Sequence, residues 1–512
     1  MPCAIKAPFH FLARYCGNTI PMTDSTSSSV SSSSSPRRLG IGLDYGTSNS
    51  VLAVFDGERL VCVPLECAGV TTPSAVHIDR QFQVCTGQAA IDRYIADNRG
   101  RRVQLAAEVL GEARTGTGQL DEEGLPALSG SEQVFGQAFV DVGEKGRLFR
   151  GVKRLLGNAS LTRLMVFEKA FRPVALVTPL LLAMRQRLRE WARQQAPGVG
   201  EADHACLGHP VNFEGREAQH NTVALERLSE AAGHAGFTRQ VFYPEPMAAA
   251  LSYMHAFPTV QPGRLLAVDF GGGTLDLCVL QRQGDAFEVL SIHGVGLGGD
   301  HLDQSLFRAL LFPLLGKGES WRRSGDEREI VTLFPFEHYE DLLLNWAVSY
   351  RLNQNEYTTP LLSCIAQGGE AVEKFQRLYT LITSNLSYLV FQSLRDVKAA
   401  LSSGESAVLD IPDLDIELAV TRAQFEAIIA HHLAHFDQAV TDTLALAQCL
   451  PEQIDDVVST GGSSLIPAVR RLLEARFPGR VQDHDPFTSV AGGLAIAEYR
   501  GLGFTRESTP RG

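Results

Sequence analysis

Two short segments place carboxylates and hydroxyls beside glycine. Residues 265–280 read LLAVDFGGGTLDLCVL, so Asp269, three glycines, Thr274 and Asp276 lie between two apolar runs. Apolar runs of this length indicate buried strands, which puts the glycines at the tip of a predicted hairpin. A bare tip lets backbone amides approach an anion, and Mg²⁺ prefers oxygen ligands while retaining waters. The segment predicts a site for a phosphate with its magnesium ion; the alternative is a glycine hairpin with surface aspartates.

A second copy of this pattern occurs at residues 39–55, LGIGLDYGTSNSVLAVF. A strand ends at Asp44, the sequence Gly46-Thr47-Ser48 turns the chain, and an apolar run follows. The two aspartates at the strand ends are roughly 225 residues apart, which favours two similar lobes over a solenoid. Two such hairpins facing each other would hold the phosphates of one nucleotide from both sides.

The elements around these hairpins follow from periodicity. We expect helices at 172–195 and 222–235, and strands at 205–211, 240–243 and 454–459. One strand is expected over 76–84, and one long amphipathic helix from Phe375 to Val397. The segment 99–133 shows no period and is expected to be a surface insertion, and the segment 311–369 is expected to be irregular.

Composition narrows the class of protein. The 512 residues are 44% hydrophobic and 20% charged, which is ordinary for a globular chain of about three domains. A net charge of −12 argues against a nucleic-acid partner, and no apolar stretch approaches the ~18 residues of a membrane helix. The nine cysteines form no CxxC pair, which is typical of reduced thiols in a cytoplasmic protein.

The two hairpins resemble the phosphate loops of the actin-like ATPase fold, which actin, sugar kinases and DnaK-class heat-shock chaperones share. Further motifs are similar to the DnaK class and follow its order: TTPS at 71–74, VKRLLG at 152–157, EPMAAALSY at 245–253, LGGDHLD at 297–303, KAALSS at 398–403, TRAQFE at 421–426 and GGSSLIP at 461–467. PVNFEG at 210–215 and FPLLG at 312–316 resemble the YegD-like branch.

The resemblance implies an α/β, two-lobed actin-like ATPase fold with duplicated ribonuclease-H-like domains and a nucleotide cleft between the lobes. Its expected division of the chain is lobe I at 38–260, lobe II at 261–481 with a subgroup insertion near 311–369, a closing segment at 482–500 and a flexible tail at 501–512. Residues 1–37 are serine-rich and expected to be disordered, and we hypothesise that translation begins at Met22. The peptide-binding domain of the class is expected to be missing.

The resemblance also implies ATP and Mg²⁺ as cofactors and assigns roles to residues. Asp44, Asp269 and Asp276 would hold the metal through water. The catalytic group would be Lys153, Glu245, Thr274, Asp269 and Asp276, with Lys153 stabilising charge on the γ-phosphate. Nucleotide contacts would come from Gly46, Thr47, Ser48, Asn49, Gly271, Gly272, Gly273, Thr274, Gly298, Gly299, Asp300, Arg395, Lys398, Ser402, Gly461, Gly462 and Ser463.

Some residues admit other interpretations. Residues 294–299, GVGLGG, match the dinucleotide-binding pattern GxGxxG, while no GxxxxGK[ST] sequence occurs. His431 and His435 are spaced i, i+4, so either a metal site or a solvated helix face accounts for them. Lys153 alone reads equally as a solvated lysine, and Glu245, between two prolines, as part of a simple turn.

The sequence departs from the family around the base. The positions where the class stacks arginines on adenine hold Ala399 and Leu465, and the acid that reaches the ribose is replaced by Arg395. We therefore expect weak discrimination between ATP and GTP, with Arg395 able to stack on the base.

Three functions fit these observations. The first is a DnaK-like ATPase in protein folding or quality control, with unfolded proteins or co-chaperones as partners. The second is a small-molecule kinase on the same fold, although no sugar-kinase signature is present. The third is a nucleotide-gated interaction protein that assembles as actin-like proteins do.

Overall fold

The computed structural model describes residues 38–67, 69–120, 126–195, 203–215, 218–258, 262–283, 286–323 and 330–507. The serine-rich segment at 1–37, the hypothesised start at Met22 and the last residues of the expected tail lie outside them. Contacts divide the chain into two compact units. The first comprises residues up to 92, 148–302 and 422–512, and the second comprises residues 93–147 and 303–421. No described helix is both long enough and apolar enough to cross a membrane.

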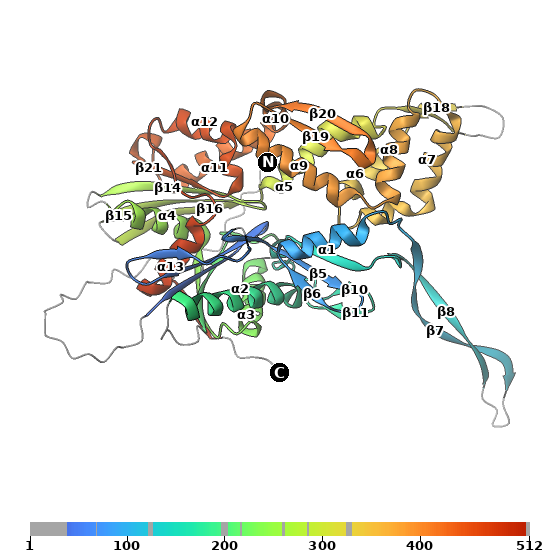
Figure 1. Cartoon of the computed structure of the whole chain (residues 1–512), viewed down its shortest axis with the longest axis horizontal. Helices are drawn as coiled ribbons and strands as arrows, with labels where there is room; N and C mark the ends of the chain where they lie inside the picture. Colours follow the sequence, from blue (N-terminus) through green and yellow to red (C-terminus); the bar gives the residue numbers. More distant parts are fainter. Residues whose placement is uncertain are drawn as a thin grey trace. The chain divides into compact units, whose positions relative to one another are not determined.

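The first unit contains two mixed sheets (Figure 1). In the first sheet, the order is β23-β13-β12-β1-β2-β3, and β4 also pairs with β2. Strand β1 runs antiparallel to β2 and parallel to β12, which is parallel to β13. Its strands are β1 (Gly40–Tyr45), β2 (Asn49–Phe55), β3 (Leu60–Cys62), β4 (Thr71–Pro73), β12 (His204–His209), β13 (Arg239–Pro244) and β23 (Phe504–Glu507).

The second sheet repeats the topology of the first. Its order is β16-β15-β14-β21-β22, with β14 antiparallel to β15 and parallel to β21, which is parallel to β22. Its strands are β14 (Gly263–Phe270), β15 (Leu275–Gln283), β16 (Ala286–Val295), β21 (Asp456–Thr460) and β22 (Val481–Asp483). Each sheet therefore has three antiparallel strands followed by two parallel ones, and the two hairpins expected from the sequence are β1–β2 and β14–β15.

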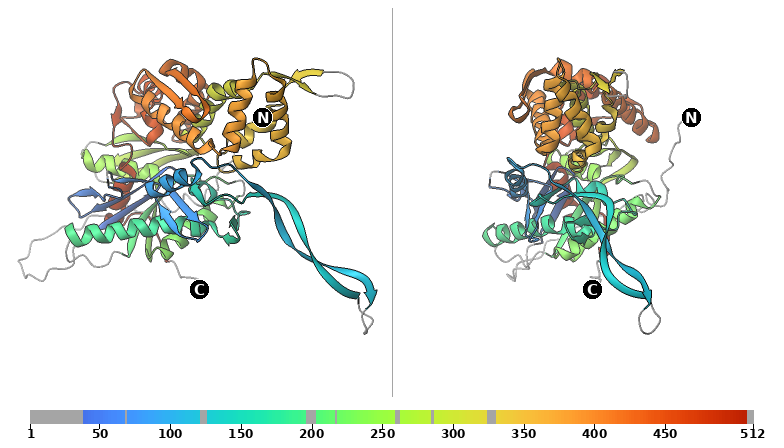
Figure 2. Two further views of the ribbon diagram at one scale, coloured as in Figure 1. Left: turned by 45° about the vertical axis from the view of Figure 1, so that its right-hand side comes forward. Right: turned by 90° about the vertical axis from the view of Figure 1, so that its right-hand side faces the viewer.

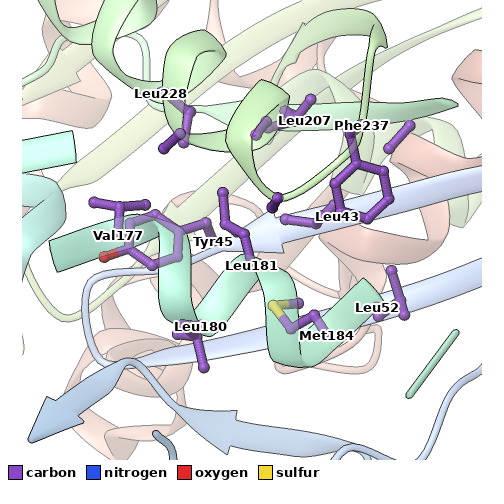
Figure 3. Close-up of a cluster of buried hydrophobic side chains, with 14 of the residues drawn as sticks. Leu43, Tyr45, Leu52, Val177, Leu180, Leu181, Met184, Leu207, Leu228 and Phe237 are labelled. Carbon is purple, nitrogen blue, oxygen red and sulfur yellow. The ribbon is translucent and has the colours of Figure 1, made fainter. Parts of the chain in front are cut away.

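The first sheet packs one face on α2 (Pro173–Gln195) and α3 (His220–His234). Figure 3 shows Leu43 and Leu207 of the sheet close to Leu181 of α2 and Leu228 of α3. The buried residues of α2 recur at three- and four-residue intervals, which gives the helix one apolar face. This confirms the two helices expected near 172–195 and 222–235.

Two further helices, α4 (Glu245–Ala256) and α13 (Ser489–Arg500), form a second core with both sheets. Small residues permit the close packing: a Cβ on Gly42 would lie 2.0 Å from the Ala491 carbonyl oxygen, and one on Gly493 would lie 1.7 Å from that of Ala248. Because no side chain fits at either position, α13 lies directly on β1 and on α4.

The rest of the first unit consists of short elements around the sheets. A three-stranded sheet has the order β6-β5-β9, and β10 pairs with β11. The strands are β5 (Ala75–Asp79), β6 (Val84–Thr86), β9 (Gly146–Arg150), β10 (Leu164–Val166) and β11 (Lys169–Phe171). The helices are α10 (Arg422–Ile428), α11 (Ala430–Leu446) and α12 (Pro467–Arg476), while α1 (Gln88–Asn98) and α5 (Gly299–Leu306) each run from the first unit into the second.

The second unit is mainly helical, with three hairpins. Its helices are α6 (Glu337–Leu343), α7 (Asn355–Gln367), α8 (Val372–Thr383) and α9 (Ser387–Ser403). Its strand pairs are β7 (Leu105–Leu120) with β8 (Pro126–Asp141), β17 (Ser320–Arg323) with β18 (Ile330–Leu333), and β19 (Ser406–Ile411) with β20 (Ile416–Thr421). Figure 2 shows β7 and β8 as a long twisted ribbon.

Three expectations about local structure are wrong. The long helix expected from Phe375 to Val397 is two helices, because Asn385 between them adopts φ +52°, a left-handed conformation that ends α8. The strand expected over 76–84 is a hairpin, in which the Asp79 carboxylate accepts hydrogen bonds from the amides of Gln81 and Gln83.

The segment 311–369, expected to be irregular, contains regular helices. The segment 99–133, expected to be a surface insertion, contains β7 and the start of β8, whose glycine-rich strands lack the apolar alternation that marks a half-buried strand. Residues 311–369 contain α6 and α7. Phe334, Phe336 and Tyr339 from this segment are buried, and the Tyr339 ring centroid lies 5.3 Å from that of Phe334 and 6.2 Å from that of Phe336. Tertiary packing of aromatic side chains, rather than periodicity, holds this segment together.

Candidate functional site

The tips of the two hairpins are in contact in the first unit. A Cβ on Gly272 would lie 2.3 Å from Ser48 Oγ, and one on Gly273 would lie 3.2 Å from Thr47 Oγ1. The glycines of the second tip therefore leave room for the hydroxyl side chains of the first. The contact joins the two repeats at the residues that the sequence singled out as phosphate-binding.

The first tip is held by its own backbone and by a neighbouring strand end. A Cβ on Gly46 would lie 2.2 Å from the Asn49 carbonyl oxygen, so the turn requires glycine. The Ser48 carbonyl accepts hydrogen bonds from the Ser74 amide at 2.9 Å and from the Arg150 guanidinium at 3.4 Å. The turn is thus fixed by interactions that leave its hydroxyl side chains available.

The second tip is supported by the segment that starts α5. The carbonyls of Gly271 and Gly272 accept hydrogen bonds from the amides of Gly299 and Asp300, at 3.1 and 2.9 Å. A Cβ on Gly298 would lie 2.3 Å from the Gly272 carbonyl oxygen. The amides at the start of α5 therefore donate their hydrogen bonds to the second tip, and in this conformation the LGGD motif supports that tip. Phosphate binding by Gly298, Gly299 and Asp300 stays a prediction.

A buried cluster of ionisable side chains lies at the bases of the two hairpins. Lys153, in the short 3-10 turn Val152–Leu155, donates a hydrogen bond to Glu245 at 2.5 Å, and both side chains are more than 90% buried. Asp269 and Asp276 are also buried. Glu245 is the first residue of α4, following β13, so a strand end and a helix start aim its carboxylate at the lysine.

The charges in this cluster shift one another's protonation. Burial and the nearby Glu245 carboxylate raise the pKa of Asp44 and of Asp276 to about 7, and Lys153 opposes both shifts. Burial and the surrounding carboxylates raise the pKa of Asp269 well above its usual range. Burial lowers the Lys153 pKa, but the neighbouring carboxylates outweigh this and raise it overall. Four acids thus surround one buried lysine, and a bound cation would favour the ionised forms of these acids.

The acids of this cluster fit a magnesium ion only when other groups complete its coordination. Among the residues that the structure describes, no group of three or more His, Cys, Asp or Glu side chains is arranged to hold a metal ion by itself. Asp44, Asp269 and Asp276 therefore do not form a direct coordination cage. Their buried negative charge fits a hydrated magnesium ion that shares its oxygen ligands with phosphates. The same result covers His431 and His435, on α11, which form no such group.

Further residues in this region were not identified from the sequence. The Val211 amide donates to Asp276 Oδ1 at 2.8 Å, so the loop after β12 holds this acid. Next to it, His209 is buried, its Nδ1 donates to the Pro210 carbonyl at 2.8 Å, and burial lowers its pKa to about 4. The motif PVNFEG marks this loop, but nothing in its composition identifies a backbone amide as the functional group.

Arg154 connects three segments around the second tip. Its guanidinium donates to Glu214 at 2.6 Å and to Asp300 at 3.1 Å. Glu214 belongs to the loop after β12, and Asp300 lies in the first turn of α5. Because Arg154 follows Lys153 directly, these ion pairs also fix the turn that carries the lysine.

The remaining predicted nucleotide contacts lie in two places. Gly461 (φ +83°) packs beside the second hairpin, where a Cβ would lie 2.6 Å from Asp269 Oδ1, and Ser463 Oγ donates to the Gly271 carbonyl at 3.0 Å. Lys398 and Arg395 lie on α9 of the second unit, with Lys398 paired to Asp303 at 2.5 Å and Arg395 5.6 Å from the Tyr388 ring. The predicted nucleotide contacts on α9 are the set Arg395, Lys398 and Ser402, and their role stays a prediction.

Comparisons with known proteins agree with this geometry. The chain is 24% identical to the chaperone protein dnaK of Cyanidioschyzon merolae, over 89% of this chain and 61% of that protein. It is 24% identical to a chaperone protein HscA homolog of Aromatoleum aromaticum, over 90% of this chain and 57% of the relative. It is 25% identical to the chaperone protein dnaK1 of Parasynechococcus marenigrum, over 89% and 56%.

The chain therefore spans 56–61% of the length of these relatives. The family described as "Hsp70 protein" matches residues 134–317 and 389–498. This match confirms the expected α/β actin-like ATPase fold, whose duplicated sheets are those of the first unit. Because the matched residues make up more than half of the 512, the chain belongs to the Hsp70 family.

Proposed function

We propose that this chain binds ATP with magnesium and hydrolyses it to ADP and phosphate, in a chaperone-type role. The observation that carries the proposal is the buried Lys153–Glu245 pair among three acids, at the bases of two glycine tips in contact. A lysine in such surroundings remains protonated and can donate to a phosphate oxygen, while the glycine tips bring backbone amides close to the phosphates.

In the proposed reaction, water adds to the γ-phosphorus as the bond to the β,γ-bridging oxygen breaks. Such a transfer needs positioning and electrostatic stabilisation rather than covalent chemistry by the protein. Lys153 would donate to the γ-phosphate and orient the water, and Glu245 would hold the lysine. Asp44, Asp269 and Asp276 would hold the hydrated magnesium ion, which supplies positive charge to the phosphates. Thr274 would complete the environment of the γ-phosphate.

The test is ATP turnover with magnesium in the wild type and in Lys153→Ala. We expect the variant to lose on the order of 10²–10³ in turnover, equivalent to about 2.7–4 kcal/mol of barrier. Lys145→Ala, which removes an exposed lysine, is the matched control and should turn over like the wild type. A wild type that binds ATP without turnover would favour the nucleotide-gated interaction protein instead. Phosphate transfer to a metabolite panel would favour the kinase.

The cellular role rests on the names of the relatives, which are chaperone proteins. We propose unfolded proteins or co-chaperones as partners, and retain membership of the YegD-like branch on the motifs PVNFEG and FPLLG. Pull-down with Thr274→Ala, intended to retain bound ATP, tests the partners. Recovery of the same proteins with and without ATP would contradict a nucleotide-regulated chaperone role. The seven free cysteines among the described residues support the proposed cytoplasmic location.

A further inference from the structure

The loop Gly461–Ser463 lies directly against the second tip, through the hydrogen bond from Ser463 Oγ to the Gly271 carbonyl. The ring of Phe487 lies beside Gly462. Phe487 Cε1 lies 3.5 Å from the position of a Cβ on Gly462, and 43% of the Phe487 residue is exposed. Leu465, the last residue of the 3-10 turn Gly462–Leu465, is 47% exposed. A nucleotide whose phosphates contact the tips would place its sugar and base near these residues.

The turn that carries Phe487 is fixed by hydrogen bonds. The Asp485 carboxylate accepts from the amides of Phe487 and Thr488 at 3.0 and 3.1 Å. The Pro486 carbonyl accepts from the Gly461 amide at 2.9 Å, which ties the turn to the glycine loop. The backbone of the turn is therefore held in place before any ligand arrives, and a side chain on a preorganised turn requires little ordering of the chain on binding.

A single exposed apolar side chain needs no special explanation. Phe487 differs because it lies beside the glycine loop, on a fixed turn, with exposed Leu465 on the same loop. The guanidinium groups that the resemblance places around adenine are absent at Ala399 and Leu465. Arg395, the replacement expected from the sequence, lies 5.6 Å from the Tyr388 ring.

We propose that Phe487 is the residue on which the base of the bound nucleotide stacks, with Leu465 extending the apolar surface. This inference rests on the proposed nucleotide binding. Every nucleobase has a π-face, so stacking on an aromatic side chain tolerates different bases. The residue thus gives a physical cause for weak discrimination: guanine and adenine nucleotides should bind within about tenfold of each other, because no hydrogen-bond readout is involved.

The experiment is calorimetric titration of Mg-ADP, Mg-GDP and Mg-tripolyphosphate into the full chain. Phe487→Ala should weaken the binding of both Mg-ADP and Mg-GDP on the order of 10- to 100-fold, which is the range for the loss of one stacked base. Tripolyphosphate, which has no base, should bind wild type and variant equally. Phe487→Trp should restore nucleotide binding to within about threefold, since its ring also stacks. Leu446→Ala, which removes an exposed apolar side chain at the end of α11, should leave the three affinities unchanged.

The outcomes separate this inference from the proposed function. If the wild type binds ADP and Phe487→Ala binds it equally well, the stacking role is wrong while nucleotide binding stands. If Phe487→Ala loses tripolyphosphate as much as ADP, the residue is structural and the inference is overturned. If the wild type binds none of the three ligands, the proposed function itself fails and the inference fails with it.

Discussion

The two hairpins have the same antiparallel strand pairing, but they carry different side chains. In β1–β2, Asp44 pairs in register with Val51, whereas in β14–β15, Asp269 pairs with Asp276. The first hairpin thus has one acid and a tip with the hydroxyl side chains of Thr47 and Ser48, and the second has two acids and a tip of three glycines followed by Thr274. The repeat supplies the same strand pairing twice, while the acids and the tip side chains differ between its two copies.

Their support differs as well. The first tip is anchored by a hydrogen bond from the Ser74 amide, and the second by the amides of Gly299 and Asp300 and by the Ser463 hydroxyl. The three glycines of the second tip have no side chains that could pack, so hydrogen bonds from neighbouring segments fix the position of this tip. Changes that exchange or disturb these features therefore test whether the two hairpins have distinct roles.

The largest expected effect follows from making the second hairpin resemble the first. Asp276→Val places valine where the first hairpin has Val51 and removes the acceptor of the Val211 amide. We expect ATP turnover to fall on the order of 10²–10³, comparable to the loss of one charge-stabilising group. Steady-state turnover with saturating magnesium measures it. Turnover within threefold of the wild type would show that the second acid has no separate role.

The acids also predict how stability depends on pH. Burial and the nearby Glu245 carboxylate raise the pKa of Asp44 and of Asp276 to about 7 in the folded, nucleotide-free chain, against an ordinary value of 3.8. The folded state therefore binds more protons than the unfolded state between these values, and its stability falls as pH rises through 7. We expect a loss of about 1–3 kcal/mol between pH 5 and pH 8, measured by denaturant unfolding.

Asp276→Asn should flatten this pH dependence, because it removes one of the titrating groups while keeping an acceptor for the Val211 amide. Asp413→Asn, at an exposed acid, serves as the control and should leave the slope unchanged. Stability that rises between pH 6 and pH 8 would mean that these carboxylates are ionised at little cost in the folded chain.

The support of the second tip is tested by two glycines in the same segment. Gly298→Ala would place a Cβ 2.3 Å from the Gly272 carbonyl oxygen, whereas Gly296→Ala meets no atom within 4 Å. We expect the first substitution to lower the free energy of unfolding by about 1–3 kcal/mol, because backbone has to move. The second should stay within about 0.5 kcal/mol of the wild type. Equal effects of the two would show that the tip does not depend on this contact.

The smallest expected effect concerns the contact between the tips. Gly272→Ala would bring a Cβ to 2.3 Å from Ser48 Oγ, a side-chain atom that is able to rotate away. We expect a weakening of nucleotide binding by about 1 kcal/mol, roughly fivefold in Kd. Adding Ser48→Gly should recover part of the loss, and a double-mutant cycle measures the coupling. Strictly additive effects would indicate that the two tips do not meet in solution.

The sequence predicted the parts of the fold that repeat or that carry strong periodicity. The two hairpins are visible because aspartate and glycine interrupt apolar runs in the same order twice, and α2 because its apolar residues recur at helical spacing. The break at Asn385 was missed because the apolar pattern continues across it, and only the left-handed backbone shows the division.

Candidate residues could be chosen from the sequence where side-chain type suggests the chemistry. Lys153, Glu245 and the three aspartates are candidates by type, and the structure brings Lys153 and Glu245 together at 2.5 Å. The contact of the Val211 amide and the proposed role of the Phe487 ring could not be predicted. A backbone donor has no sequence signature, and a single phenylalanine is usually a core residue, so both depend on tertiary packing that no local pattern encodes.

A crystal structure with magnesium and a non-hydrolysable ATP analogue would show whether the two tips enclose the phosphates of one nucleotide. We expect phosphate oxygens between Gly46–Ser48 and Gly271–Gly273, within hydrogen-bond distance of backbone amides from both hairpins. A nucleotide bound elsewhere, or phosphates that contact one hairpin alone, would contradict this expectation.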